Sequence, residues 1–88
     1  MSMPEISRFL GIIIAMYYND HSPPHFHARY GDAKAEIEIQ SLTTLAGKLP
    51  PRVLGLVIEW ASQHQEELLM DWELARQHQQ LKDIKPLE

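Results

Sequence analysis

The chain has 88 residues, of which 44% are hydrophobic and 23% are charged, and its formal net charge is −4 at pH 7. These values predict one small folded domain, residues 1–88, with a core limited by the chain length. The absence of cysteine excludes disulfides, thiolate metal ligands and cysteine nucleophiles, and it favours a cytoplasmic location. The net charge does not support binding to nucleic acid, although local recognition stays open. The apolar run at residues 12–16 is too short to cross a membrane, so no membrane partner is expected.

The first third of the chain is predicted to be β-structure. Residues 8–18 are almost all apolar or aromatic and include Ile12-Ile13-Ile14, which is typical of one strand buried on both faces. Residues 19–24 carry Asn, Asp, Ser and two prolines, and this composition predicts the turn that ends the strand. Two further strands are expected at residues 25–30 and 33–39. They are joined by Gly31-Asp32, a two-residue hairpin signal.

The two-residue turn fixes the register of this expected hairpin, and therefore which side chains share a face. One face is apolar and suits the core, whereas the other carries histidines and charges, with Cβ atoms about 5 Å apart across the strands. The apolar pairs are Tyr30–Ala33, Ala28–Ala35 and Phe26–Ile37, and the polar pairs are Arg29–Lys34, His27–Glu36 and His25–Glu38.

The second half of the chain is predicted to be helical between residues 50 and 80. Leu49-Pro50-Pro51 suits a helix start, because the first turn of a helix tolerates proline. One apolar stripe follows at intervals of three and four, formed by Val53, Leu56, Val57, Trp60, His64, Leu68 and Trp72. Residues 40–48 are interpreted as a polar connection and residues 81–88 as a short tail. The predicted fold class is α+β, with a three-stranded antiparallel β-meander within residues 5–40 and one long bent helix or two C-terminal helices packed on one face.

The order of motifs along almost the whole chain resembles the bacterial domain of unknown function 4160 (DUF4160). The motifs are Met3-Pro4-Glu5-Ile6-Ser7-Arg8-Phe9, Gly11-Ile12, Met16-Tyr17, Asp20-His21, Pro23-Pro24-His25-Phe26-His27-Ala28, Tyr30-Gly31, Gly47-Lys48-Leu49-Pro50, Glu59-Trp60-Ala61, Glu67-Leu68, Trp72 and Pro86-Leu87. The resemblance implies a short single-domain bacterial protein without an established activity. It also implies a gene beside that of another small protein, as in toxin–antitoxin pairs. Glu36 and Arg29 are not fixed parts of the family pattern.

Three of the five histidines lie within residues 21–27, and a first interpretation is a metal site. His25 and His27 are spaced to point the same way from a strand, and His21 and Asp20 lie just before them. Imidazole and carboxylate groups are ligands of divalent transition metals such as Zn²⁺. The sequence lacks the downstream spacing of cupin-type sites and has no His-Glu-x-x-His helix motif.

A second interpretation is catalytic. His25 or His27 would act as a general acid or base, oriented by Glu38 or Glu36, with Arg29 or Lys34 stabilising an anion. This group of residues is the minimum for a small hydrolase or a metal-independent ribonuclease. The lack of a basic surface and of a nucleophile placed with a base argues against it.

A third interpretation gives the histidines a structural role, in which the imidazoles stack on Tyr17 or Tyr18 and satisfy local hydrogen bonds. A fourth makes them part of a protein-binding surface that includes Arg29, Glu36 and Tyr17. A homodimer or a stable protein partner is expected, because so small a domain buries little surface alone. The expected function is a small cytoplasmic interaction module, one component of a toxin–antitoxin-like pair. The alternative is a hydrolase, ribonuclease or metal-binding protein that uses His21, His25 and His27.

Overall fold

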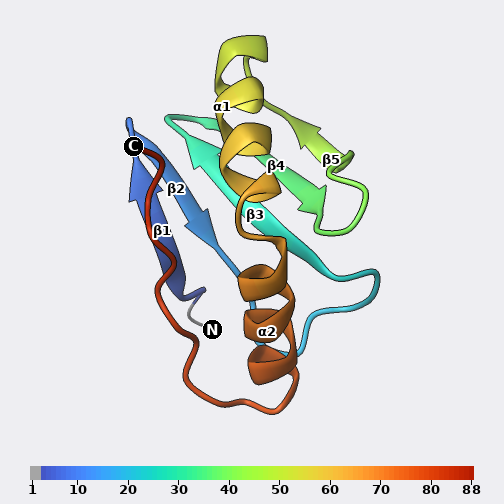
Figure 1. Ribbon diagram of the computed structural model, residues 1–88. Helices are drawn as coiled ribbons and strands as arrows, with labels where there is room; N and C mark the ends of the chain where they lie inside the picture. The colour runs from blue at the N-terminus through green and yellow to red at the C-terminus, as the bar shows by residue number, and fades with distance from the viewer. Residues whose placement is uncertain (1–2) are drawn as a thin grey trace.

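The computed structural model describes residues 3–88 and has an α+β fold, in which two helices cover one face of a five-stranded antiparallel sheet (Figure 1). The strands lie in the sheet in chain order. The strands are β1 (Glu5–Phe9), β2 (Ile12–Ala15), β3 (His25–Tyr30), β4 (Ala33–Glu38) and β5 (Thr44–Lys48), and the helices are α1 (Pro51–Ser62) and α2 (Gln65–Arg76). Neither helix of the described chain has the length or the apolar composition needed to span a lipid bilayer.

The central hairpin of β3 and β4 has the register that the Gly31-Asp32 turn predicts. All six predicted pairs are present, from Tyr30–Ala33 at the turn to His25–Glu38 at the open end. Four of the six residues on the apolar face of this hairpin are buried, namely Phe26, Ala28, Ala35 and Ile37, whereas Ala33 is half-buried and Tyr30 is 41% exposed beside the turn. Phe26 lies edge-on to Trp60 of α1, with ring centroids 5.9 Å apart. Burial of each such aromatic side chain contributes about 2–3 kcal/mol, so this contact is central to the packing of helix on sheet.

The prediction of three strands is wrong, because the sheet has two more. The apolar segment expected to be one strand is a hairpin, β1 and β2, which turns at Leu10 and Gly11 with φ angles of 52° and 79°. Glycine adopts such angles without strain, which makes Gly11 the sequence signal for the turn. The segment interpreted as a polar connection contains β5, which pairs with β4 through an irregular register between Glu36 and Ile37.

The helical half divides into two helices, one of the two arrangements expected, with the break at Gln63 and His64. The tail then folds back onto the domain beside β1 (Figure 1). The backbone N–H of Ile84 donates to the carbonyl oxygen of Ile6 at 2.8 Å, and the indole N–H of Trp60 donates to the carbonyl oxygen of Lys85 at 2.8 Å. The tail therefore covers part of the β1 edge and closes one side of the core.

The tail also contacts a buried acid on α2. Asp71 is 1% exposed, and its Oδ1 accepts the backbone N–H of Lys82 at 2.9 Å. Its Oδ2 has no hydrogen-bond partner among the described residues. Burial raises the pKa of Asp71, and the nearby carboxylates of Asp83 and Glu67 raise it further, against the lowering effect of Lys82. Ionisation of Asp71 is therefore less favourable in the folded protein than in the unfolded chain.

We predict that Gly47→Ala lowers the free energy of unfolding by about 2 kcal/mol or more. Gly47 has a φ of +78°, and a Cβ there would overlap the carbonyl oxygen of Lys34 and lie 2.9 Å from the Cα of Ala35. Gly55 has open space around it in α1, so Gly55→Ala is the matched control and should raise stability by about 0.5–1 kcal/mol. Urea unfolding measures both values, and equal effects would contradict the close approach of β5 to β4.

We predict that Asp71→Asn raises the free energy of unfolding at pH 7 by about 1 kcal/mol, because it removes a buried charge and keeps the acceptor for Lys82. The pKa of Asp71 is raised on folding, so the wild type loses stability as the pH rises from about 4 through the folded pKa. The difference between the variants should therefore be largest at pH 7 and fade near pH 4.

Thermal unfolding from pH 4 to 8 tests this prediction, with Asp32→Asn in the exposed β3–β4 turn as the control. A difference that does not change with pH would show that the charge of Asp71 is not its source.

Candidate functional site

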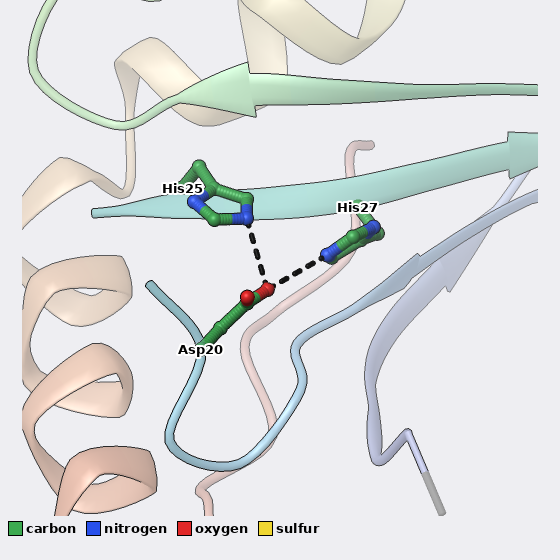
Figure 2. Close-up of side chains that lie close together, drawn as sticks. All are labelled: Asp20, His25 and His27. Atoms are coloured by element: carbon green, nitrogen blue, oxygen red, sulfur yellow. Dashed lines mark hydrogen bonds and ion pairs between the residues drawn. The ribbon is translucent and has the colours of Figure 1, made fainter. Parts of the chain in front are cut away.

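Asp20, His25 and His27 meet beside the start of β3 and form what is here called the Asp–His cluster. The three residues offer ligand atoms that lie within 4.8 Å of one another. Figure 2 shows both imidazoles projecting from β3 towards the carboxylate, which comes from the loop between β2 and β3. The alternation of side chains along a strand explains why His25 and His27 share a side.

The loop is held so that one carboxylate oxygen of Asp20 faces the imidazoles. The backbone N–H of Asn19 donates to the carbonyl oxygen of Ala75 at 3.1 Å, which ties the loop to the end of α2. The Oδ1 atom of Asp20 accepts the backbone N–H of His21 at 2.8 Å. The Oδ2 atom lies 3.0 Å from Nε2 of His25 and 3.4 Å from Nε2 of His27.

The Asp20 carboxyl has its pKa lowered by this environment. Partial burial would raise the pKa, but the hydrogen bond from the His21 N–H opposes it. The imidazole of His27 and the positive charge of a protonated His25 or His21 act in the same direction. Asp20 is therefore ionised near neutral pH, and its oxygens act only as acceptors or ligands.

His25 is the most constrained member of the Asp–His cluster. Its side chain is 1% exposed and lies beside Trp72 of α2, with ring centroids 5.2 Å apart. Its Nδ1–H donates to the carbonyl oxygen of Pro23 at 2.7 Å, because a carbonyl can only accept. The other ring nitrogen, Nε2, faces an oxygen of the ionised Asp20 carboxylate. The close approach of these two atoms requires either a proton on Nε2 or a cation bound between them.

Glu36 is the second carboxylate near the cluster. Its Oε1 lies 3.6 Å from Nε2 of His25, although its register partner is His27. Sequence reasoning placed Glu36 beside His27 and offered it as an orienting carboxylate. The pairing of Glu36 with His27 predicted that Glu36 would lie near the histidines. It did not predict that the Glu36 carboxylate reaches diagonally across the strands to His25.

Two residues of the sequence-based site lie outside the cluster. Glu38 is opposite His25 in the register, but its carboxylate accepts a hydrogen bond from the Ser41 hydroxyl at 2.9 Å, and no ion pair within residues 3–88 joins it to a histidine. The His21 side chain is 83% exposed and contacts the other oxygen of Asp20, through Nδ1 at 2.9 Å from Oδ1. Ser41, three residues after Glu38, is the sequence signal for this competing contact.

A pocket of about 360 Å³ lies next to the Asp–His cluster, on the polar face of the β3–β4 hairpin that the register assigns to His27, Arg29, Lys34 and Glu36. His27 and Glu36 line it, so one side of the cluster opens into it. Tyr17 meets His27 edge-on, with ring centroids 4.7 Å apart. The other charged residues of the pocket wall are Arg29 and Lys34. The pocket therefore contains all three residues that the sequence suggested as a partner surface, Tyr17, Arg29 and Glu36.

The arrangement can hold a metal ion. Zinc bonds of 2.0–2.2 Å in a tetrahedron place neighbouring ligand atoms about 3.3–3.6 Å apart. Of the three contacts to Asp20 and Glu36 described above, those of 3.4 and 3.6 Å match this spacing and that of 3.0 Å is shorter. In metal-binding histidines, a hydrogen bond from the ring nitrogen that does not bind the metal fixes the tautomer. The bond from Nδ1 of His25 to the Pro23 carbonyl is of this kind.

Comparison with known proteins identifies the family of this chain. Neither the curated proteins nor the solved structures gave a match. The profile of the domain of unknown function DUF4160 matches residues 11–73. This range contains the Asp–His cluster, Glu36, all of α1 and most of α2. Because the match covers well over half of the sequence, the chain belongs to the DUF4160 family.

Proposed function

We propose that the protein binds a divalent transition-metal ion, of which zinc is the best fit, through Nε2 of His25, Nε2 of His27 and the carboxylate of Asp20. The observation that carries this proposal is the orientation of His25. Its Nδ1–H is committed to the Pro23 carbonyl, and its Nε2 faces a carboxylate oxygen in a buried position. Glu36 is placed to act as a fourth ligand.

The chemistry of the donor set supports this proposal. Two imidazole nitrogens with one or two carboxylates suit Zn²⁺, and the same set also suits iron. The cost of burying His25 as a cation would be avoided, because a metal ion could neutralise Asp20 and Glu36 without a second proton on the imidazole. A zinc ion held here would lower the pKa of a bound water and could support hydrolysis.

We predict that tag-free protein binds about one zinc ion per chain and that His27→Ala weakens zinc binding roughly 100-fold, the scale expected when a metal site loses a supporting group or ligand. The His27 side chain is 19% exposed, so its removal should leave the fold intact. His78→Ala, at an exposed histidine beyond the end of α2, is the matched control and should bind like the wild type.

Elemental analysis after dialysis against trace zinc, together with calorimetric titration, measures these affinities. Zinc should also raise the melting temperature of the wild type by more than that of His27→Ala. His21→Ala should change the affinity less than twofold if His21 is not a ligand. Metal-free wild type, or full zinc binding by His27→Ala, would overturn the proposal and leave Asp20 and His25 as a hydrogen-bonded pair.

A second candidate is the small cytoplasmic interaction module, one component of a toxin–antitoxin-like pair. The observation that favours it is the β5 edge of the sheet. β5 pairs with β4 on one side, and all five of its residues are exposed, including Leu45 at 42%. Such an edge offers backbone groups and an apolar side chain to a strand of a second chain, whether another copy or a partner protein.

We predict that, if β5 is an interface, light scattering gives the mass of a dimer for the wild type and of a monomer for Leu45→Lys, because lysine on an edge strand opposes pairing. Leu10→Lys, at an exposed leucine in the β1–β2 turn, is the control and should not change the mass. A monomeric wild type would exclude the homodimer, and a Leu45→Lys dimer would exclude β5 as its interface.

A further inference from the structure

Three cations lie side by side across the sheet face that contains the pocket. Arg29 of β3 pairs with Lys34 of β4, and Lys34 pairs in turn with Lys48 of β5. These three residues, here called the cation row, are all exposed. They supply three of the eight Lys and Arg residues of a chain with net charge −4.

The cation row is unfavourable on its own. Like charges directly opposite each other on neighbouring strands destabilise a sheet. The ion pairs that Arg and Lys form within residues 3–88 involve Arg8, Arg76 and Lys85 instead. A bound anion would offset this repulsion.

The pocket connects the cation row to the Asp–His cluster. Arg29 and Lys34 stand on its wall together with His27, Glu36 and Tyr17. Its volume, about 360 Å³, is at the lower end of the range for small-ligand sites. A ligand in the pocket can therefore contact the two cations at one end and reach the cluster at the other.

We propose that this pocket binds a small phosphate monoester, with the phosphate group between Arg29 and Lys34 and the organic group against Tyr17. A guanidinium and an ammonium side by side suit a dianion, and arginine binds phosphate oxygens in a bidentate manner. The proposal deepens the proposed function and rests on it, because the metal site would border this ligand and would neutralise Asp20 and Glu36. A long polyanion fits less well, because the same face also carries negative charges that would repel it. Glu5 lies on β1, where it pairs with Arg8, and Glu38 lies at the end of strand β4.

The test uses phenylphosphonate, whose P–C bond resists hydrolysis, and benzoate, which has the same ring with a carboxylate. Amide chemical shifts in NMR titrations give the Kd of each probe, with and without one equivalent of zinc. We expect phenylphosphonate to shift amides around residues 27–29, 34–36 and 46–47 and to bind more tightly than benzoate. Arg29→Gln and Lys34→Gln should each weaken it roughly tenfold, the loss expected for one charge-assisted hydrogen bond.

The controls are Arg52→Gln and Lys85→Gln, which remove exposed cations outside the pocket and should leave the Kd unchanged. Zinc binding without phenylphosphonate binding would overturn this inference and leave the proposed function standing. Binding of phenylphosphonate by a wild type that takes up no zinc would overturn the metal site and the dependence of the anion pocket on it. Equal binding of benzoate would overturn the assignment to phosphate, and tighter binding of a short RNA would overturn the small-ligand assignment.

Discussion

The two-residue turn at Gly31 and Asp32 is the constraint on which both the core and the site depend. It sets the pairing of β3 with β4, and the pairing decides which side chains reach the helices. A slip of one residue would turn Phe26 away from Trp60 and bring His27 towards the core. Packing energy and placement of the imidazoles are therefore fixed together, by the same local geometry.

The helical layer contributes to the site as well as to the core. Asp20 belongs to a loop that is bonded to the last turn of α2 through Asn19 and Ala75, and Trp72 of the same helix covers His25. The position of the carboxylate relative to the imidazoles thus depends on the docking of α2. Substitutions that shift this helix are expected to change the cluster without touching any of its three residues.

The hairpin and the two-helix half could be predicted from the sequence, because both depend on local patterns. The two-residue turn between the strands expected at 25–30 and 33–39 predicted the observed register. The helical stripe from Val53 to Trp72 lies within α1 and α2 except for His64, which stands at the break between them. The turn between β1 and β2 was missed because Leu10 extends the apolar run, although Gly11 signalled it. The strand β5 was missed because its pairing is irregular and its residues are all exposed.

The candidate site could be predicted only in part. Strand alternation placed His25 and His27 together, and proximity in sequence suggested Asp20. The diagonal reach of Glu36 and the capture of Glu38 by Ser41 depend on the twist of the sheet and on the turn after β4. The pocket beside the cluster arises from the shape of the whole sheet face, which no local pattern contains.

The C-terminal tail has a consequence for how many copies of this chain can join. By bonding to Ile6 it occupies part of one edge of the sheet, and β5 is left as the other edge. Growth of a sheet from copy to copy needs two free edges on every chain, whereas an antiparallel pair of β5 strands would use the free edge of both copies. Edge pairing would therefore stop at a dimer with a ten-stranded sheet and would not continue into a fibre. A chain without its last residues would expose the β1 edge and could add further copies there.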